Sequence, residues 1–342
     1  MPYAIAVMRA LVQGYGVSVD CIYWDENKRT PFIPVNESGI TFHKRSTFDE
    51  VKIKTFIRDR NPSIIYIAGR MDKLYLGAAL HFKHSSIIVS GCDNQWTGSL
   101  KQRIAALFSR HLYRRYFQYV WVPGKRQHLY AKKMGYADKN IIPNLLTADT
   151  AVFGTVYHEN KQLKREHYPH TIVYAGRFAK SKGVDILIAA FKEAKKETQN
   201  NWQLILVGAG DVPVANEPFI KISGFMQANE LASESRYWGV FCLPSRYEPW
   251  GVVIHEFAMV GLPIICTDSA GAADELVMNN ENGSIFKSGD KNSLKEAILT
   301  MMSKGDDELL LMGEKSYELS KKQSMEIAAQ SLMNAIAKNK LT

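Results

Sequence analysis

The pattern that limits the fold of this chain most strongly lies in residues 240–266. Val240–Leu243 is a short apolar run typical of a buried strand, and Val252–Val260 has the apolar spacing of a helix. A glycine and a proline then end the helix before the next predicted strand, Ile264–Cys266. A strand, turn, helix and strand in this order predict a parallel α/β sheet, in which ligands bind beyond the carboxyl ends of the strands.

The turn before this helix has residue types that suit an anion. Pro249 stiffens the backbone, Trp250 offers a flat apolar face, and Gly251 allows the chain to approach a ligand closely. The N–H groups of Gly251, Val252 and Val253 would point at the ligand, because the first N–H groups of a helix have no partner within it. We therefore expect an anion, most commonly a diphosphate, at this helix N-terminus.

Two glutamates lie on either side of this expected anion site. Glu256 lies five residues after Gly251, about 7.5 Å along the helix axis, where its carboxylate could accept hydrogen bonds from a ribose diol. Glu248 precedes the turn and could bind hydroxyl groups on the other side of the diphosphate. Glutamates at this spacing also occur by chance, so the spacing alone is weak evidence. Together with the turn, it predicts a nucleotide joined to a polyhydroxy group.

The longer pattern carries a family resemblance. L-P-S-R-Y-E-P-W-G, followed by H-E and then by G-L-P-I-I-C-T-D, resembles the donor-site signature of retaining glycosyltransferases of the GT-B type, family 4 (group 1). The resemblance implies two Rossmann-like, doubly wound α/β domains that face a central cleft. It also implies a nucleotide-sugar donor, with a UDP-sugar preferred over a GDP-sugar, retention at the anomeric carbon, and no metal or other cofactor.

A second part of the resemblance follows the predicted strand Thr171–Tyr174. The sequence there is A-G-R-F-A-K-S-K-G, and in the family its arginine and lysine, here Arg177 and Lys182, grip the donor diphosphate. A bidentate guanidinium and a compact ammonium suit a leaving diphosphate. Solvated loop cations are the alternative for these two residues. With Glu248, which would orient the sugar, they form the predicted catalytic set.

Further donor-binding residues are expected at the ends of neighbouring strands. Gly176 and Gly208 follow two predicted strands, and I-S-G-F, which ends at Phe225, resembles the family segment whose backbone holds the base. V-G-A-G-D, which contains Gly208, lacks the third glycine of a dinucleotide fingerprint, so a dehydrogenase is not indicated. The complete predicted donor-binding set is Gly176, Gly208, Phe225, Pro249, Trp250, Gly251, Val252, Val253 and Glu256.

The length of 342 residues predicts two domains. We expect an acceptor-side domain at 1–150, a donor domain at 151–323, and a terminal helix at 324–342 that crosses back to the first domain, as in the family. Asn144–His170, with little periodicity, is the expected linker, with a hinge near its start. The family opens with a strand that this chain lacks, so we expect that Met1 is not the natural start.

The other expected elements alternate between helix and strand. The predicted strands are Val17–Tyr23, Ile64–Ala68, Ile87–Ser90, Tyr119–Val122, Ile141–Pro143 and Trp202–Gly208. The predicted helices are Pro2–Val12, Phe48–Arg58, Leu74–Lys83, Ser99–Tyr116, Gln127–Met134, Val184–Glu197, Ser293–Met302 and Ser324–Ala337.

Charge is concentrated in the first half of the chain. Residues 1–150 contain 22 Lys and Arg against 11 Asp and Glu, whereas the remainder contains 21 against 23. No acidic residue occurs between Asn94 and Ala137, and Ser99–Tyr116 has an apolar stripe bordered by basic residues. The basic field predicts an anionic partner. We expect residues 99–133 to lie on an anionic membrane, and a soluble helix packed on the sheet is the alternative.

Cysteines and histidines add little chemistry. Cys21, Cys92, Cys242 and Cys266 lie in or beside apolar runs and are expected to be buried free thiols. Two histidine pairs have spacings that could suit a metal, but no further ligands accompany them, so no metal site is predicted. Where the family has a histidine after a strand of the first domain, this chain has G-C-D-N, and any acceptor-side role would pass to Asp93.

The functional expectation combines these observations. We expect a cytoplasmic hexosyltransferase, peripheral on the inner face of the cell membrane, that uses a glycan or polyprenyl-linked acceptor in bacterial surface polysaccharide synthesis. A catalytically degenerate member that binds a nucleotide sugar or a membrane is the alternative. A nucleic-acid partner is not expected, because the sequence contains no recognised nucleic-acid-binding module.

Overall fold

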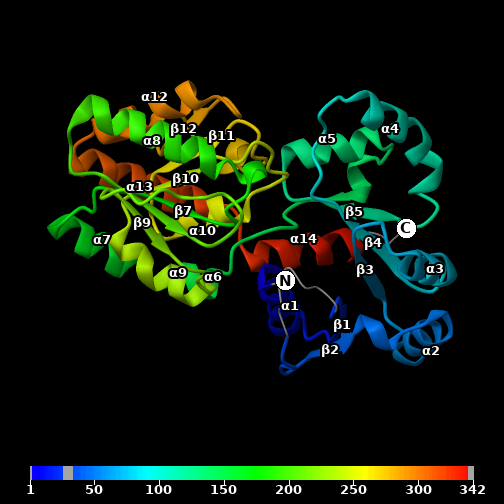
Figure 1. The fold of residues 1–342 in the computed structure, drawn as a ribbon. Helices are drawn as coiled ribbons and strands as arrows, with labels where there is room; N and C mark the ends of the chain where they lie inside the picture. Colours follow the sequence, from blue (N-terminus) through cyan, green and yellow to red (C-terminus); the bar gives the residue numbers. More distant parts are fainter. Residues whose placement is uncertain (1, 26–33, 338–342) are drawn as a thin grey trace. The chain divides into compact units, whose positions relative to one another are not determined.

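The computed structural model describes residues 2–25 and 34–337. The chain divides into two compact units, which are described separately: unit 1 is Met1–Thr147 with Met325–Thr342, and unit 2 is Ala148–Ser324. Each unit is built on a parallel sheet with helices packed against it (Figure 1). The predicted α/β class with two parallel sheets is therefore confirmed.

Unit 1 contains two parallel sheets. One pairs β1 with β2, and the other has its four strands in sequence order, β3-β4-β5-β6. The strands are β1 (Val19–Tyr23), β2 (Ile40–Lys44), β3 (Ile64–Ala68), β4 (Ile87–Gly91), β5 (Tyr119–Trp121) and β6 (Ile141–Ile142). The α-helices are α1 (Pro2–Tyr15), α2 (Glu50–Arg60), α3 (Lys73–Phe82), α4 (Leu100–Leu112), α5 (Lys125–Lys133) and α14 (Met325–Ala337).

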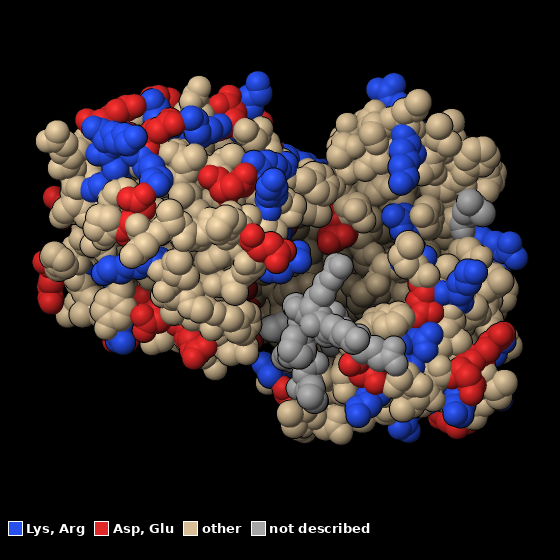
Figure 2. All heavy atoms as spheres, viewed as in Figure 1, with Lys and Arg blue, Asp and Glu red and all other residues tan. Residues whose placement is uncertain are grey.

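The core of unit 1 joins the two ends of the chain. Val7 of α1 and Leu332 of α14 pack in one apolar cluster with Val89 of β4 and Trp121 of β5. The Tyr119 hydroxyl donates a hydrogen bond of 3.4 Å to the carbonyl oxygen of Ala335. The terminal helix α14 thus belongs to unit 1 although unit 2 precedes it in the sequence. Over α4 and α5 the surface shows lysine and arginine, and no acidic residue in this view (Figure 2).

Unit 2 has a single six-stranded parallel sheet in the order β12-β11-β10-β7-β8-β9. The strands are β7 (Thr171–Ala175), β8 (Gln203–Val207), β9 (Ile220–Ser223), β10 (Val240–Leu243), β11 (Ile264–Thr267) and β12 (Gly283–Phe286). The α-helices are α6 (Thr150–Phe153), α7 (Tyr157–Glu166), α8 (Val184–Thr198), α9 (Ala228–Glu234), α10 (Val252–Met259), α11 (Ala273–Leu276), α12 (Lys291–Met302) and α13 (Asp306–Ser320).

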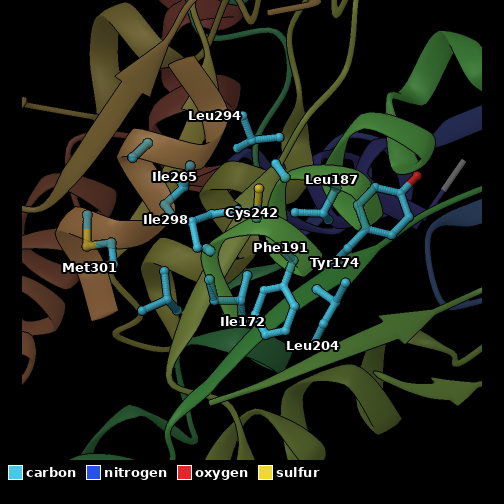
Figure 3. Close-up of a cluster of buried hydrophobic side chains, with 14 of the residues drawn as sticks. Ile172, Tyr174, Leu187, Phe191, Leu204, Cys242, Ile265, Leu294, Ile298 and Met301 are labelled. Carbon is cyan, nitrogen blue, oxygen red and sulfur yellow. The ribbon is translucent and has the colours of Figure 1, made fainter. Parts of the chain in front are cut away.

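Short apolar runs bounded by glycine and proline place β7, β8, β10 and β11 close to their predicted positions, whereas β9 and β12 were not predicted. Ile172 and Cys242 project from neighbouring central strands into the main core, where they meet Phe191 of α8 and Ile298 of α12 (Figure 3). All four side chains are completely buried. Parallel strands covered on both faces read as continuous apolar runs, which explains why β10 was predicted with its exact bounds.

The structure corrects three expectations. The segment 144–170 is not an irregular linker, because it contains α6 and α7. Tyr157 of α7 stacks on Tyr317 of α13, with ring centroids 3.5 Å apart, so a tertiary contact stabilises a helix whose sequence shows little apolar periodicity. Cys21 is only partly buried, whereas the other three cysteines are buried. The strands of unit 1 form two sheets among the described residues, because β1 pairs with β2 and not with the four-stranded sheet. The strand β2 was not predicted.

Within the described ranges no helix combines the length and the apolarity that crossing a bilayer requires. Met1, for which we expected a non-natural start, lies outside the described residues.

Candidate functional site

The order of strands in unit 2 makes one edge of the sheet the candidate binding site. From the central pair β7 and β10 the chain proceeds outward in opposite directions, to β8 and β9 on one side and to β11 and β12 on the other. The loops after β7 and β10 therefore lie at the reversal of strand order, and the region beyond the carboxyl ends of these two strands is here called the crevice. Open α/β sheets bind ligands at this reversal, beyond the carboxyl ends of the strands.

The loop after β10 is held in shape by the loop after β11. The N–H of Gly271 donates to the Glu248 carbonyl oxygen at 3.2 Å, and the N–H of Ala272 donates to the Trp250 carbonyl oxygen at 2.9 Å. Gly251 then adopts φ 96° as the N-cap residue of α10, a left-handed conformation that favours glycine. Val252 and Val253 form the first turn of α10, and their side chains are partly buried. The predicted helix N-terminus is thus present at the crevice.

The loop after β7 reaches the same place. A short 3₁₀ turn, Lys180–Lys182, ends at Gly183, whose φ is 70° and whose added Cβ would collide with the Pro244 carbonyl oxygen. The N–H of Arg246 donates to the Ser181 carbonyl oxygen at 3.0 Å. The backbones of the two loops are therefore in direct contact, and only glycine fits at position 183.

This contact brings two predicted catalytic side chains together. Lys182 Nζ lies 2.6 Å from Glu248 Oε2, and the Ser245 hydroxyl donates to the same carboxylate oxygen at 3.1 Å. The Lys182 side chain is 27% exposed and that of Glu248 is 13% exposed, so the ion pair is partly shielded from water and remains accessible. The sequence assigned both residues to one site but contained no signal for their direct contact or for Ser245.

Arg246 lies inside the recognised motif and has a different task. Its guanidinium binds both carboxylate oxygens of Asp185 on α8, at 2.7 and 2.8 Å, and hydrogen bonding by this guanidinium holds the pKa of Asp185 below its usual value. A bidentate pair of this kind joins the loop after β10 to the helix after β7. Sequence analysis did not assign a role to either residue.

Arg177, Gly176, Gly208 and Phe225 lie along the carboxyl ends of β7, β8 and β9. The N–H of Gly176 donates to the Val207 carbonyl oxygen, and the N–H of Gly208 donates to the Ser223 carbonyl oxygen. These bonds continue the hydrogen bonding of the sheet beyond the ends of the strands. The Arg177 side chain is exposed, and its carbonyl oxygen accepts a 2.7 Å hydrogen bond from the Tyr174 hydroxyl. Phe225 is 75% exposed. These four residues therefore share one edge of the sheet with Lys182 and Glu248.

Trp250 differs from its expected arrangement. The side chain is only 2% exposed, so the ring does not offer its face to a ligand in this structure, and only the backbone of the turn lies at the crevice. The large apolar ring is instead buried within unit 2. Pro249, which precedes it, is partly buried.

Glu256 lies on α10 in surroundings that disfavour its charge. Burial, and to a lesser extent repulsion by Asp149, raises the pKa of Glu256 from 4.5 to about 7. A carboxylate that is partly desolvated before a ligand binds is suited to accept hydrogen bonds from hydroxyl groups. The preceding residue, His255, is completely buried and faces away: its Nδ1 accepts from the N–H of Ala148 and its Nε2 donates to the Ser320 carbonyl oxygen, each at 2.9 Å.

The raised pKa predicts that Glu256→Gln stabilises unit 2. At neutral pH the carboxyl of Glu256 is ionised in the unfolded chain, whereas burial opposes its ionisation in the folded protein. The free energy of unfolding therefore falls as pH rises from 4.5 to about 7. Glutamine removes this penalty, and we expect a gain of about 2 kcal/mol at pH 8 that disappears near pH 4. Urea unfolding of both proteins at the two pH values measures it. An equal free energy of unfolding at pH 8 would contradict the desolvation.

Among the described residues no group of three or more His, Cys, Asp or Glu side chains is arranged to hold a metal. The crevice contains the cations Arg177 and Lys182, the carboxylate of Glu248 and the N-terminus of α10.

Comparison with known proteins identifies this unit. A family model described as "Glycosyl transferases group 1" matches residues 158–319. An uncharacterized glycosyltransferase of Methanocaldococcus jannaschii is 32% identical over 163 residues, which cover 45% of this chain and 44% of that protein. The matched segment spans half or less of the length of the first curated relatives.

Solved structures extend the likeness to the fold of the whole chain. HepE of Anabaena, solved in complex with UDP-glucose, matches with a TM-score of 0.67 and 15% identity, covering 87% of this chain and 86% of that chain. A sucrose-phosphate synthase from Thermosynechococcus elongatus matches with a TM-score of 0.71 and 16% identity, covering 98% and 92%. These are GT-B structures, and the fold is shared. Residues 158–319 therefore belong to the group 1 glycosyltransferase family, also called family 4.

Proposed function

We propose that the protein transfers a hexose from a nucleotide-sugar donor, preferentially a UDP-sugar, to an acceptor with retention of anomeric configuration. The observation that carries the proposal is the Lys182–Glu248 pair at the strand-order reversal of unit 2, beside the N-terminus of α10. A cation, a carboxylate and a helix N-terminus suit a diphosphate joined to a polyhydroxy group. Membership of family 4, and the UDP-glucose complex of the structural relative HepE, support the same reading.

Each site residue has a proposed role. Arg177, Lys182 and the first N–H groups of α10 bind the donor diphosphate and stabilise the charge that develops on it. Glu248 orients the sugar and Glu256 accepts hydrogen bonds from the ribose. Lys182 already contacts Glu248, so a single ammonium could bridge the sugar-binding carboxylate and the leaving group.

The chemical step is proposed as a front-face substitution. The bond between the anomeric carbon and the diphosphate oxygen breaks with its electron pair on the diphosphate. The acceptor oxygen forms the new bond on the same face, and its proton passes to the leaving diphosphate. Lys182 and Arg177 lower the energy of this step because they stabilise the departing negative charge in a partly dehydrated site. We propose that the transfer requires no metal.

The acceptor is proposed to bind unit 1. Its basic residues favour an acceptor that carries phosphate, such as a glycan on a polyprenyl diphosphate. Synthesis of a bacterial surface polysaccharide at the inner face of the cell membrane would use such an acceptor. Asp93, which follows β4 and has an exposed side chain, is the proposed acceptor-side residue.

A thermal-shift experiment tests the donor site. UDP, GDP, ADP and their common hexoses are added to the wild type, to Glu256→Ala and to the control Asp307→Ala, which removes an exposed carboxylate of α13. A donor at about 100 times its Kd should stabilise the folded state by about 2.7 kcal/mol. We expect the largest rise with the UDP series in the wild type and control, and a much smaller one in Glu256→Ala.

The outcomes separate the proposals. If no nucleotide raises the unfolding temperature of the wild type, the proposed donor site is wrong. If UDP binds but no sugar is transferred from UDP-hexoses to any of a panel of lipid-linked acceptors, the degenerate nucleotide-sugar binder becomes the better description.

A further inference from the structure

Helix α4 packs on unit 1 with its polar side and leaves its apolar side exposed. Leu100, Leu107 and Phe108 are 74%, 75% and 65% exposed, and Ile104 is 49% exposed. At about 100° per residue these four side chains occupy one face of the helix. Ser109 lies on the opposite face and is only 1% exposed. An ordinary surface helix has the reverse arrangement, with its large apolar residues against the core.

The polar attachment of α4 is specific. Gln102, on the same side as Ser109, donates to the Gln95 carbonyl oxygen at 2.9 Å and accepts from the N–H of Thr97 at 2.7 Å. Ser99 caps the helix through a 3.3 Å hydrogen bond from the N–H of Gln102. These bonds hold the helix on its polar side, so the exposed apolar face is a defined feature of unit 1.

Basic residues border the apolar face, and the surrounding sequence, residues 94–137, contains no acidic residue. Lys101 flanks the face beside Phe108, and Arg103 flanks it beside Leu107. Arg114 and Arg115 follow the helix with exposed side chains. No acidic residue occurs in residues 94–137, and Figure 2 shows lysine and arginine among uncharged residues over α4 and α5. Long basic side chains beside an apolar stripe suit a helix at a lipid–water interface.

We infer that α4 docks on an anionic lipid bilayer, with Leu100, Ile104, Leu107 and Phe108 inserted among the acyl chains and the flanking cations on lipid phosphates. A bilayer fits both halves of the surface, since it offers an apolar layer directly beneath a layer of negative charge. A second copy of the chain fits less well, because two faces bordered by cations would repel each other. The inference needs no assumption about the donor or the reaction.

Vesicle binding tests the inference with the full chain. We expect cosedimentation with vesicles of phosphatidylglycerol and phosphatidylcholine, and weak binding to pure phosphatidylcholine. Leu107→Ser/Phe108→Ser should lower the partition coefficient at least about tenfold, because serine lacks the favourable free energy of transferring a large apolar side chain from water into the acyl layer. Lys101→Gln/Arg103→Gln should lower it about fivefold for each charge. Leu311→Ser, which changes a leucine of α13 that is 64% exposed, should bind as the wild type does.

Several results would overturn the inference. Wild type that binds neither kind of vesicle, or a Leu107→Ser/Phe108→Ser variant that binds undiminished, excludes membrane docking by α4. A wild-type dimer in sedimentation velocity that the same double variant dissociates would assign the face to a second copy. UDP-induced thermal stabilisation should be unchanged in the α4 variants and vesicle binding unchanged in Glu256→Ala, so failure at one site is distinguishable from failure at the other.

Discussion

Lys182→Ala is expected to lower kcat at least about 100-fold. The change in the free energy of unfolding should be much smaller than the change in activation free energy that this loss of rate represents. Loss of one group that stabilises developing charge in the transition state costs about 10²–10³ in rate. The Lys182 side chain is only 27% exposed and binds Glu248, so its ammonium is placed where the leaving diphosphate is proposed to lie. Initial rates with a UDP-hexose and urea unfolding of the same preparation measure the two effects.

Matched variants decide whether Lys182 acts on the donor or only holds Glu248. Lys180→Ala removes an exposed lysine from the same 3₁₀ turn and should keep its activity. Lys182→Arg retains the charge without the compact ammonium, and should recover donor binding more than kcat. Equal losses of activity and stability in Lys182→Ala would contradict the catalytic assignment and indicate a structural ion pair. We expect Arg177→Ala to behave as Lys182→Ala does.

His255→Ala is expected to destabilise unit 2 by about 3 kcal/mol, because it removes two buried hydrogen bonds to backbone groups and opens a cavity. The imidazole forms hydrogen bonds with Ala148, the first residue of unit 2, and with Ser320, the last residue of α13. It therefore connects the beginning of unit 2 to a segment near its end. His167→Ala, which removes an exposed histidine that follows α7, is the control and should unfold as the wild type does. Urea unfolding at neutral pH makes the comparison.

The pH dependence of His255 has a definite sign. Burial lowers the pKa of His255 from 6.5 to about 4. Unfolded chains take up a proton on this histidine below pH 6.5, whereas the folded protein does so only near pH 4, so acid destabilises the fold across that interval. The full effect is about 3 kcal/mol. In His255→Gln this contribution is absent, and the difference in free energy of unfolding between wild type and variant should shrink as pH falls from 6.5 to 4.

The neighbouring Glu256 has the opposite dependence. Its folded pKa is raised to about 7, so acid stabilises the fold between about pH 7 and 4.5, while the lowered pKa of His255 makes acid destabilise it over nearly the same interval. The two contributions largely cancel in the wild type. Single substitutions should therefore reveal slopes of opposite sign, and the pair Glu256→Gln/His255→Gln should restore a nearly flat profile.

Local sequence patterns were sufficient for most strands of unit 2 and for the start of α10. Apolar runs ended by glycine or proline located β7, β10 and β11, because the geometry of a strand and of a helix terminus depends on nearby residues. The motif beside Gly251 also gave correct expectations for the turn and the family. By contrast, α7 was missed, because it is stabilised by stacking of Tyr157 on Tyr317, which is remote in the sequence.

The sequence by itself determined the α/β class and the family, and it predicted which residues follow the strands of unit 2 at one edge of the sheet, since each depends on short-range spacing. Only the tertiary structure decided that Lys182 contacts Glu248, that the Trp250 ring is buried, and that α4 turns its apolar face outward. An apolar stripe predicts which side chains share a helix face, and a loop motif predicts which groups follow a strand. What lies opposite them depends on strand order and packing between distant segments, and no local pattern encodes that.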